Sequence, residues 1–313
     1  MPDSIPRRTF LASLAAGSVS LKSLAAAAVP ASELRDGPAF RKQLRNEVGM
    51  TVSSFSGHMT ARPTAGKFTL LELPRLMRDE LGMRVIDLNT DVVIDNDPAW
   101  AERARQAVAD AGCVLTNLKL NQRGLDVGHE DPEVRRRAVA GYSTSIETAA
   151  RLGCAWVRVL PLRTAPHRPG YVAALRELAD VAAGRGLRLL VENYGWMEDD
   201  PASVATLIRE VDRGLAASPD TGNWADHKTR LSGLRQTFPL AVTCDFKFRQ
   251  LNEAGEHPLF DLESCFQVGW QAGYRGPWCL EHANRDRKVL FQELRLIRDR
   301  LRGWIATAEQ SSE

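Results

Sequence analysis

The chain of 313 residues has few of the side chains that bind softer metal ions, with only six histidines and five cysteines. The cysteines form no C-x-x-C pair, which makes a zinc ribbon unlikely. Several of them lie in or beside predicted strands, where cysteine is usually a small buried hydrophobic residue. Because the export signal described below would place the thiols in an oxidising compartment, a disulfide stays open as an alternative.

The charge pattern also lacks extremes. The net charge is +2, 26% of the residues are charged, and no basic stripe typical of nucleic-acid binding is evident. No glycine-rich phosphate cradle stands out either. These properties describe an ordinary soluble surface, and we expect no nucleic-acid partner.

The N-terminus resembles a twin-arginine export signal. Arg7 and Arg8 precede Phe10 and a weakly apolar stretch that ends in small residues suited to cleavage after Ala28 or Ala31. The alternative is an N-terminal membrane anchor, but the run is short and rich in alanine and serine for a bilayer span. We therefore predict a signal over residues 1–31, a periplasmic or secreted mature protein, and no stable membrane insertion after cleavage.

Residues 32–313 have the usual length of one (β/α)8 TIM barrel. Continuous apolar runs alternate with amphipathic helical segments, as expected for buried parallel strands between helices. The eight predicted strands are Val48–Phe55, Met83–Leu88, Val114–Leu120, Ala155–Leu160, Leu187–Glu192, Leu215–Ser218, Ala241–Asp245 and Trp278–Glu281. No second domain or internal repeat is evident.

Four carboxylates, Glu192, Asp220, Asp245 and Glu281, stand at the ends of the last apolar runs. In a parallel barrel the C-terminal ends of all strands face the same mouth, so these acids should converge. Unpaired carboxylates would repel one another, and a divalent cation among them is the simplest compensation. The pattern predicts a metal enzyme.

Each acid also has a simpler interpretation. Glu192 could form a salt bridge to a barrel arginine such as Arg158. Asp220, in the segment Asp-Thr-Gly-Asn, could form an Asx-turn that caps the next helix. Asp245 and Lys247 share one face of a strand and could be an ion pair.

Three further side chains near predicted strand ends are candidates for substrate contact. His58 follows the first strand and would lie at the barrel mouth if that strand is predicted correctly. Trp196 and Trp224 follow two of the predicted ligands, and they could stack on a sugar ring or pack between barrel loops.

The stretch from Glu192 to Glu281 resembles the xylose isomerase-like TIM barrels described as sugar phosphate isomerases or epimerases. That family has Glu-Asn after strand five, Asp-x-Gly-Asn after strand six, His-x-Lys at strand seven and a closing Glu on strand eight. The matching segments here are Glu192-Asn193, Asp220-Thr-Gly-Asn223, Asp245-Phe-Lys247 and Glu281, and the acidic turn Asn252–Glu256 follows in register.

The chain departs from this pattern at two positions. Asp245 stands where the family has a histidine ligand, and Tyr194 replaces a common histidine after Glu-Asn. An all-oxygen donor set favours one Mg²⁺ or Mn²⁺ ion over zinc.

The resemblance implies an isomerase or epimerase that forms an enediolate on a small sugar or polyol. Glu192 and Glu281 would move the proton and, with Asp220 and Asp245, hold the metal. Lys247 would support the developing oxyanion.

The other residues expected to contact substrate are Asn193, Asn223, His58 and Trp196. The oligomeric state stays open, a homo-oligomer included.

Three rival functions remain. A lyase or hydratase on an oxidised keto sugar would use the same enolate chemistry. A sugar-binding barrel without catalysis is the second, because the family histidine is missing. An abasic-site endonuclease is disfavoured, since its zinc ions need more histidines than these strand ends provide.

Overall fold

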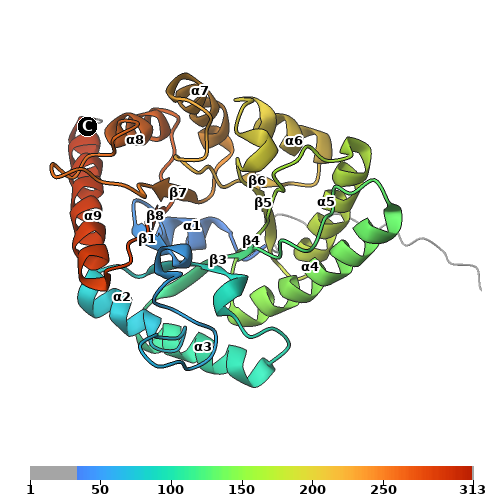
Figure 1. The fold of residues 1–313 in the computed structure, drawn as a ribbon, viewed down its shortest axis with the longest axis horizontal. Helices are drawn as coiled ribbons and strands as arrows, with labels where there is room; N and C mark the ends of the chain where they lie inside the picture. The colour runs from blue at the N-terminus through green and yellow to red at the C-terminus, as the bar shows by residue number, and fades with distance from the viewer. Residues whose placement is uncertain (1–33, 312–313) are drawn as a thin grey trace, which may run out of the picture.

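The computed structural model of the protein describes residues 34–311, and the predicted export signal lies outside the described residues. Eight parallel strands form one curled sheet, surrounded by helices (Figure 1). The strands are β1 (Val48–Thr51), β2 (Val85–Asn89), β3 (Val114–Leu120), β4 (Trp156–Val159), β5 (Arg188–Val191), β6 (Ala216–Ala217), β7 (Cys244–Lys247) and β8 (Trp278–Glu281).

The sheet order is β6-β5-β4-β3-β2-β1-β8-β7. Isolated bridges from Ala217 to Ala241 and from Asp220 to Asp245 join the two outer strands, β6 and β7, and so complete the circle. The fold is therefore the predicted (β/α)8 barrel.

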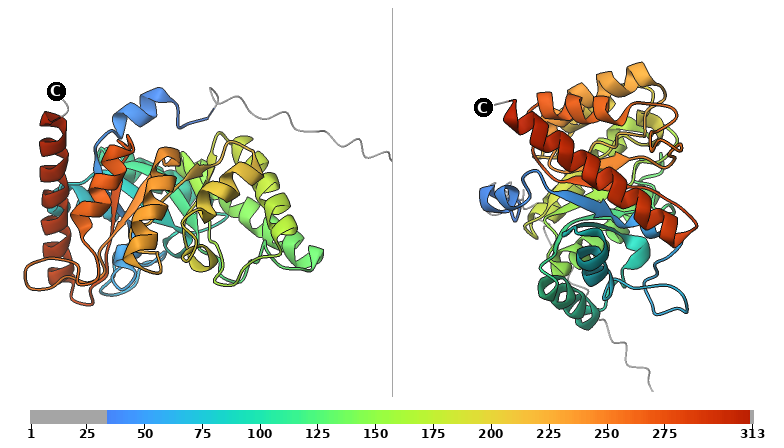
Figure 2. Two further views of the ribbon diagram at one scale, coloured as in Figure 1. Left: turned by 90° about the horizontal axis from the view of Figure 1, so that it is seen from above. Right: turned by 90° about the vertical axis from the view of Figure 1, so that its left-hand side faces the viewer.

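A ring of helices covers the outside of the sheet (Figures 1 and 2). They are α2 (Leu73–Leu81), α3 (Pro98–Asp110), α4 (Pro132–Leu152), α5 (Arg168–Ala183), α6 (Ser203–Val211), α7 (His227–Thr237), α8 (Leu262–Gln271) and α9 (Arg287–Gln310). Among the described residues, no helix is long and apolar enough to cross a membrane.

The short helix α1 (Pro38–Gln43) lies apart from this ring, at one end of the barrel (Figure 2). Phe40 and Leu44 pack on a small apolar cluster inside the barrel that includes Trp156. Asp36 fixes this segment: its carboxylate accepts hydrogen bonds from Arg188 at 2.7 Å and from Trp156 at 3.1 Å. This end of the barrel is thus closed by apolar packing.

Alternation along the strands places polar side chains inside the other end of the barrel. On β4, Val157 and Val159 pack outward against the helices, while Trp156 and Arg158 alternate with them. The buried polar side chains near the C-terminal strand ends are Thr51, Asp87, Asn89, Asn117, Lys119, Arg158, Glu192, Asp245, Lys247 and Glu281.

Two strand predictions were wrong by more than two residues at a boundary. The first strand ends at Thr51, because Val52–Phe55 form a 3-10 helix, η2. The seventh strand begins at Cys244 and runs on to Lys247, because the 3-10 turn η5 (Phe238–Leu240) delays entry into the sheet. Asp245 therefore lies inside its strand, two residues before Lys247.

All five cysteines are buried and free. The disulfide alternative is not found in the structure, and the expectation that cysteine acts here as a small buried residue is confirmed.

Candidate functional site

The candidate site is a pocket of about 610 Å³ at the C-terminal ends of the strands. Glu192 and Glu281 line it, together with Asn223. Asp220 and Asp245 are fully buried next to these side chains. The four predicted carboxylates therefore converge, as expected from their positions at the strand ends.

Three of the carboxylates form a tighter group. One oxygen each from Glu192, Asp220 and Asp245 lies within 4.8 Å of the others. Glu281 is outside this triad, but it contacts Lys247, which also binds Asp220. The converging acids thus divide into a buried triad and one separate glutamate.

Basic side chains accompany the acids. Lys119 on β3 forms an ion pair with Asp245 and donates a hydrogen bond to Thr51 at 2.9 Å. Arg158 lies 2.6 Å from Glu192, so the salt bridge considered for this pair is present. Burial would lower the pKa of Lys119, but Asp245 and the other nearby carboxylates raise it, so it stays charged.

On the opposite wall, Lys247 makes three contacts with oxygen atoms. Its Nζ lies 2.8 Å from Asp220 Oδ2, 2.8 Å from Asn223 Oδ1 and 3.2 Å from Glu281 Oε1. Arg249 adds a contact of 2.8 Å to Glu281. The ion pair considered as an alternative for Asp245 and Lys247 is thus not formed, because each of them binds a partner from another segment of the chain.

These contacts have different effects on two of the acids. Burial raises the pKa of Asp220 to about 6, against the attraction of Lys247. Burial would also raise the pKa of Glu281, but Lys247, Lys119 and Arg249 lower it to about 2. Glu281 is therefore ionised at neutral pH, as a proton acceptor must be.

Asp220 is held in place by its own turn. Its Oδ1 accepts hydrogen bonds from the backbone N–H groups of Gly222 at 2.7 Å and Asn223 at 3.1 Å. The Asx-turn alternative is thus correct for this oxygen, whereas the next helix is capped by Asp226. A Cβ atom at Gly222 would lie 2.5 Å from Cδ of Lys247, so glycine leaves room for the lysine stem.

Asn193, in the loop after β5, supports this turn. Its fully buried side chain donates to the carbonyl oxygens of Asp220 and Asn223, both at 2.9 Å, and accepts from the Asp220 N–H at 2.8 Å. With both ends of its amide engaged, Asn193 positions the site. Asn223 instead lines the pocket and donates to Glu192 Oε1 at 3.2 Å.

The other predicted contacts lie elsewhere. His58 Nε2 is 2.9 Å from the carbonyl oxygen of Asn284, outside the residues that line the pocket. Trp196 packs edge-on against Tyr171 and beneath Arg168. Trp224 is buried against Gly233.

Gly195 connects two loops beside the pocket. Its φ is +62°, and a Cβ atom there would lie 2.3 Å from the carbonyl oxygen of Leu162. Only glycine allows the loop after β5 to approach the loop after β4 so closely. Tyr194, next to it, lines the pocket with the Arg163 guanidinium 5.4 Å from its ring centre.

The donors of the triad fit a divalent cation. All are carboxylate oxygens, the type that Mg²⁺ and Mn²⁺ prefer. Asp245 Oδ2 is buried without a hydrogen-bond partner, although buried carboxylate oxygens are normally satisfied. The buried acidic triad could therefore hold one divalent metal ion.

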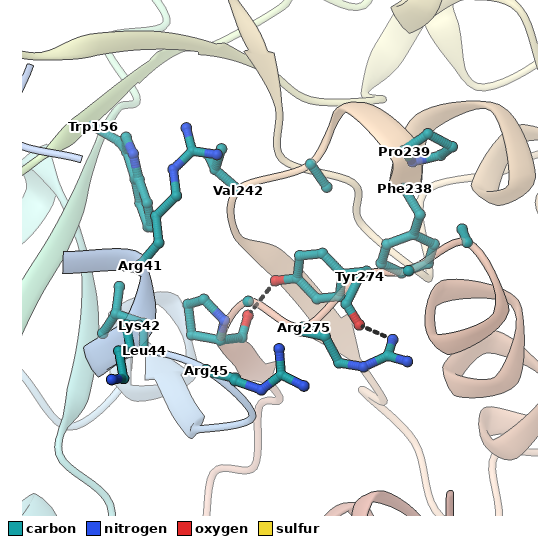
Figure 3. Close-up of a pocket in the computed structure, with 15 residues that line it drawn as sticks. Arg41, Lys42, Leu44, Arg45, Trp156, Phe238, Pro239, Val242, Tyr274 and Arg275 are labelled. Carbon is teal, nitrogen blue, oxygen red and sulfur yellow. Dashed lines mark hydrogen bonds between the residues drawn. The ribbon is translucent and has the colours of Figure 1, made fainter. Parts of the chain in front are cut away.

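A second pocket, of about 360 Å³, lies at the α1 end of the barrel (Figure 3). Basic side chains of Arg41, Lys42, Arg45 and Arg275 line it. Among the described residues that line this pocket there is no carboxylate. We therefore assign the chemistry to the C-terminal end of the barrel, where acids and bases converge.

Comparison with known proteins agrees with this architecture. Residues 79–307 match the family model described as xylose isomerase-like TIM barrel, and the chain belongs to this family. No curated protein sequence matches the chain.

Solved structures share the fold at low sequence identity. A D-psicose 3-epimerase determined in the presence of D-fructose is 15% identical, with a TM-score of 0.64 and coverage of 84% of this chain and 98% of that one. The 3-keto-D-glucoside 4-epimerase of E. coli is 17% identical, with a TM-score of 0.62 and coverage of 81% and 99%. A Mycobacterium smegmatis barrel in complex with magnesium is 18% identical, with a TM-score of 0.61 and coverage of 84% and 97%.

Proposed function

We propose that the protein is a carbohydrate isomerase or epimerase that moves a proton between a substrate carbon and two glutamates. One observation carries the proposal: Glu192 and Glu281 line the same pocket and are joined by a continuous arc of contacts. Asn223 donates to Glu192, Lys247 donates to Asn223, and Lys247 also contacts Glu281. A sugar bound against this arc has a carboxylate at either end of it.

The roles of the chain's own residues follow from their contacts. Glu192 removes the proton from the carbon beside the substrate carbonyl and releases it to solvent in a later step. Glu281 takes up a proton from solvent and passes it to the substrate carbon, and the two roles exchange in the reverse direction. Lys247, held between them, stabilises negative charge on the neighbouring oxygen. Arg158 orients Glu192 through a contact of 2.6 Å.

We further propose that the triad of Glu192, Asp220 and Asp245 holds one Mg²⁺ or Mn²⁺ ion. When bound, such an ion supplies Lewis-acid polarisation of the carbonyl group. The all-oxygen donors and the unsatisfied Asp245 Oδ2 support this choice. The magnesium-bound family member with the same fold agrees with it.

The D-psicose 3-epimerase and the 3-keto-D-glucoside 4-epimerase of similar fold guide the choice of sugars for the test. Free, phosphorylated and 3-keto sugars should be incubated with the protein and MnCl2, and the products examined by NMR and mass spectrometry. We expect at least one ketose to give a rearranged sugar of unchanged mass. A product that has lost water would indicate a lyase or hydratase instead. Sugars that bind but do not react would point to a binding barrel.

A further inference from the structure

The triad is already neutralised by the protein itself. Glu192 is paired with Arg158, Asp245 with Lys119 and Asp220 with Lys247. Arg249 pairs with the fourth carboxylate, Glu281. Each of these four acids thus already has a basic partner, and a divalent cation bound among them would bring two further positive charges next to those bases in a largely buried site.

The triad oxygens are not equally available to an incoming ion. Asp245 keeps Oδ2 without a hydrogen-bond partner while Lys119 is held on Oδ1. Asp220 has no such spare oxygen, because Oδ1 binds two backbone N–H groups and Oδ2 binds Lys247. An ion can therefore reach Asp245 beside Lys119, but it can reach Asp220 only by replacing an existing contact.

Lys247 is the contact that can be replaced. The backbone donors to Oδ1 belong to the tight turn at Gly222 and cannot leave without unfolding it. The Lys247 ammonium instead stands at the end of a flexible stem and lines the open pocket. It also keeps a second acceptor, Asn223 Oδ1, that lies outside the triad.

We propose that Lys247 and the divalent cation compete for Asp220, so that Lys247 sets the affinity of the site for metal. This inference rests on the cation site proposed above. Metal binding is then an exchange in which the ammonium moves from Asp220 toward the pocket. There it lies closer to a bound sugar, which would couple metal loading to the oxyanion contact expected of this lysine.

The chain offers a matched control two residues away. Arg249 also contacts Glu281, at 2.8 Å, but it makes no contact with a triad carboxylate. Lys247→Met and Arg249→Met therefore remove the same charge next to the same glutamate. Only the first of them frees Asp220.

The test measures Mn²⁺ binding to chelator-treated protein by isothermal titration calorimetry. We expect Lys247→Met to bind Mn²⁺ at least about tenfold more tightly than the wild type, because a nearby like charge is removed. Arg249→Met should stay within about threefold of the wild type, because an exposed charge is screened by solvent. Lys247→Gln serves if the methionine variant folds poorly. The rise in melting temperature on adding MnCl2 should also be larger in the Lys247 variant.

Three results would overturn the inference. Equal or weaker binding by the Lys247 variants would show that the lysine does not compete. Equal tightening by Arg249→Met would show a general charge effect. Absence of Mn²⁺ binding in every variant would remove both this inference and the proposed cation site. Tighter binding by Lys247→Met without turnover of any sugar would leave the inference standing while the proposed reaction failed.

Discussion

Replacing Glu192 or Glu281 with glutamine is expected to lower kcat/KM for the substrate by about 10²–10⁴-fold, the usual contribution of a positioned general acid or base. Glutamine keeps the shape of the side chain but cannot accept the proton. Both glutamates line the pocket, and Glu281 is ionised at neutral pH because nearby bases lower its pKa to about 2. Steady-state kinetics on the reactive sugar from the panel gives the measurement.

The control for this pair is Asp91→Asn. Asp91 is an exposed acid that lines the same pocket outside the arc of contacts. Loss of the Asp91 carboxylate should leave kcat within a few-fold of the wild-type value. In the glutamate variants, kcat should fall while KM changes little. Because Glu192→Gln weakens the bond to buried Arg158, its folding should be checked by circular dichroism. A folded Glu192→Gln protein with wild-type kcat would contradict the assigned role.

Asp245→Asn is expected to destabilise the fold by about 3–5 kcal/mol, the effect of removing one partner of a buried ion pair. Lys119 is 3% exposed and Asp245 is fully buried, so water cannot replace the lost carboxylate. The remaining hydrogen bond of Lys119, to Thr51, does not balance its charge. Urea unfolding of metal-free protein, followed by fluorescence, measures the loss.

The double variant Lys119→Met with Asp245→Asn separates charge from packing. It removes both charges and keeps the approximate volume of both side chains. We expect it to recover much of the lost stability, because replacing a whole buried pair is often close to neutral. If the free energy of unfolding of Asp245→Asn lies within about 1 kcal/mol of the wild-type value, the ion pair with Lys119 contributes little stability.

The strand-end acids could be predicted because two simple regularities combine. Apolar runs mark buried parallel strands, and parallel strands of a barrel end at a common mouth. Val114–Leu120 and Trp278–Glu281 are strands with the predicted boundaries. The convergence of Glu192 and Asp220 with the other two acids then follows from topology.

The pairing of charges was harder to predict, because it depends on contacts between strands far apart in sequence. Lys119 lies 126 residues before its partner Asp245. A signal did exist: Lys119 alternates with Leu118 and Leu120 inside an apolar strand, so its side chain must point into the barrel. An inward-facing lysine needs a buried acid, but the sequence does not say which one.

The loop contacts could not be derived either. His58 and Trp196 lie near strand ends in the sequence, yet the loops turn them toward Asn284 and Tyr171. Loop conformation depends on specific close approaches, such as the one at Gly195, rather than on periodicity.

Proton transfer between the site and a sugar carbon should also cause exchange of that proton with solvent. A ketose that binds the protein should be incubated in D2O with MnCl2 and followed by NMR. We predict that deuterium enters the carbon beside the carbonyl even when net conversion is small, because exchange requires only the enolate. The signal should disappear in Glu192→Gln. A bound ketose that gains no deuterium with the wild-type protein would contradict the account.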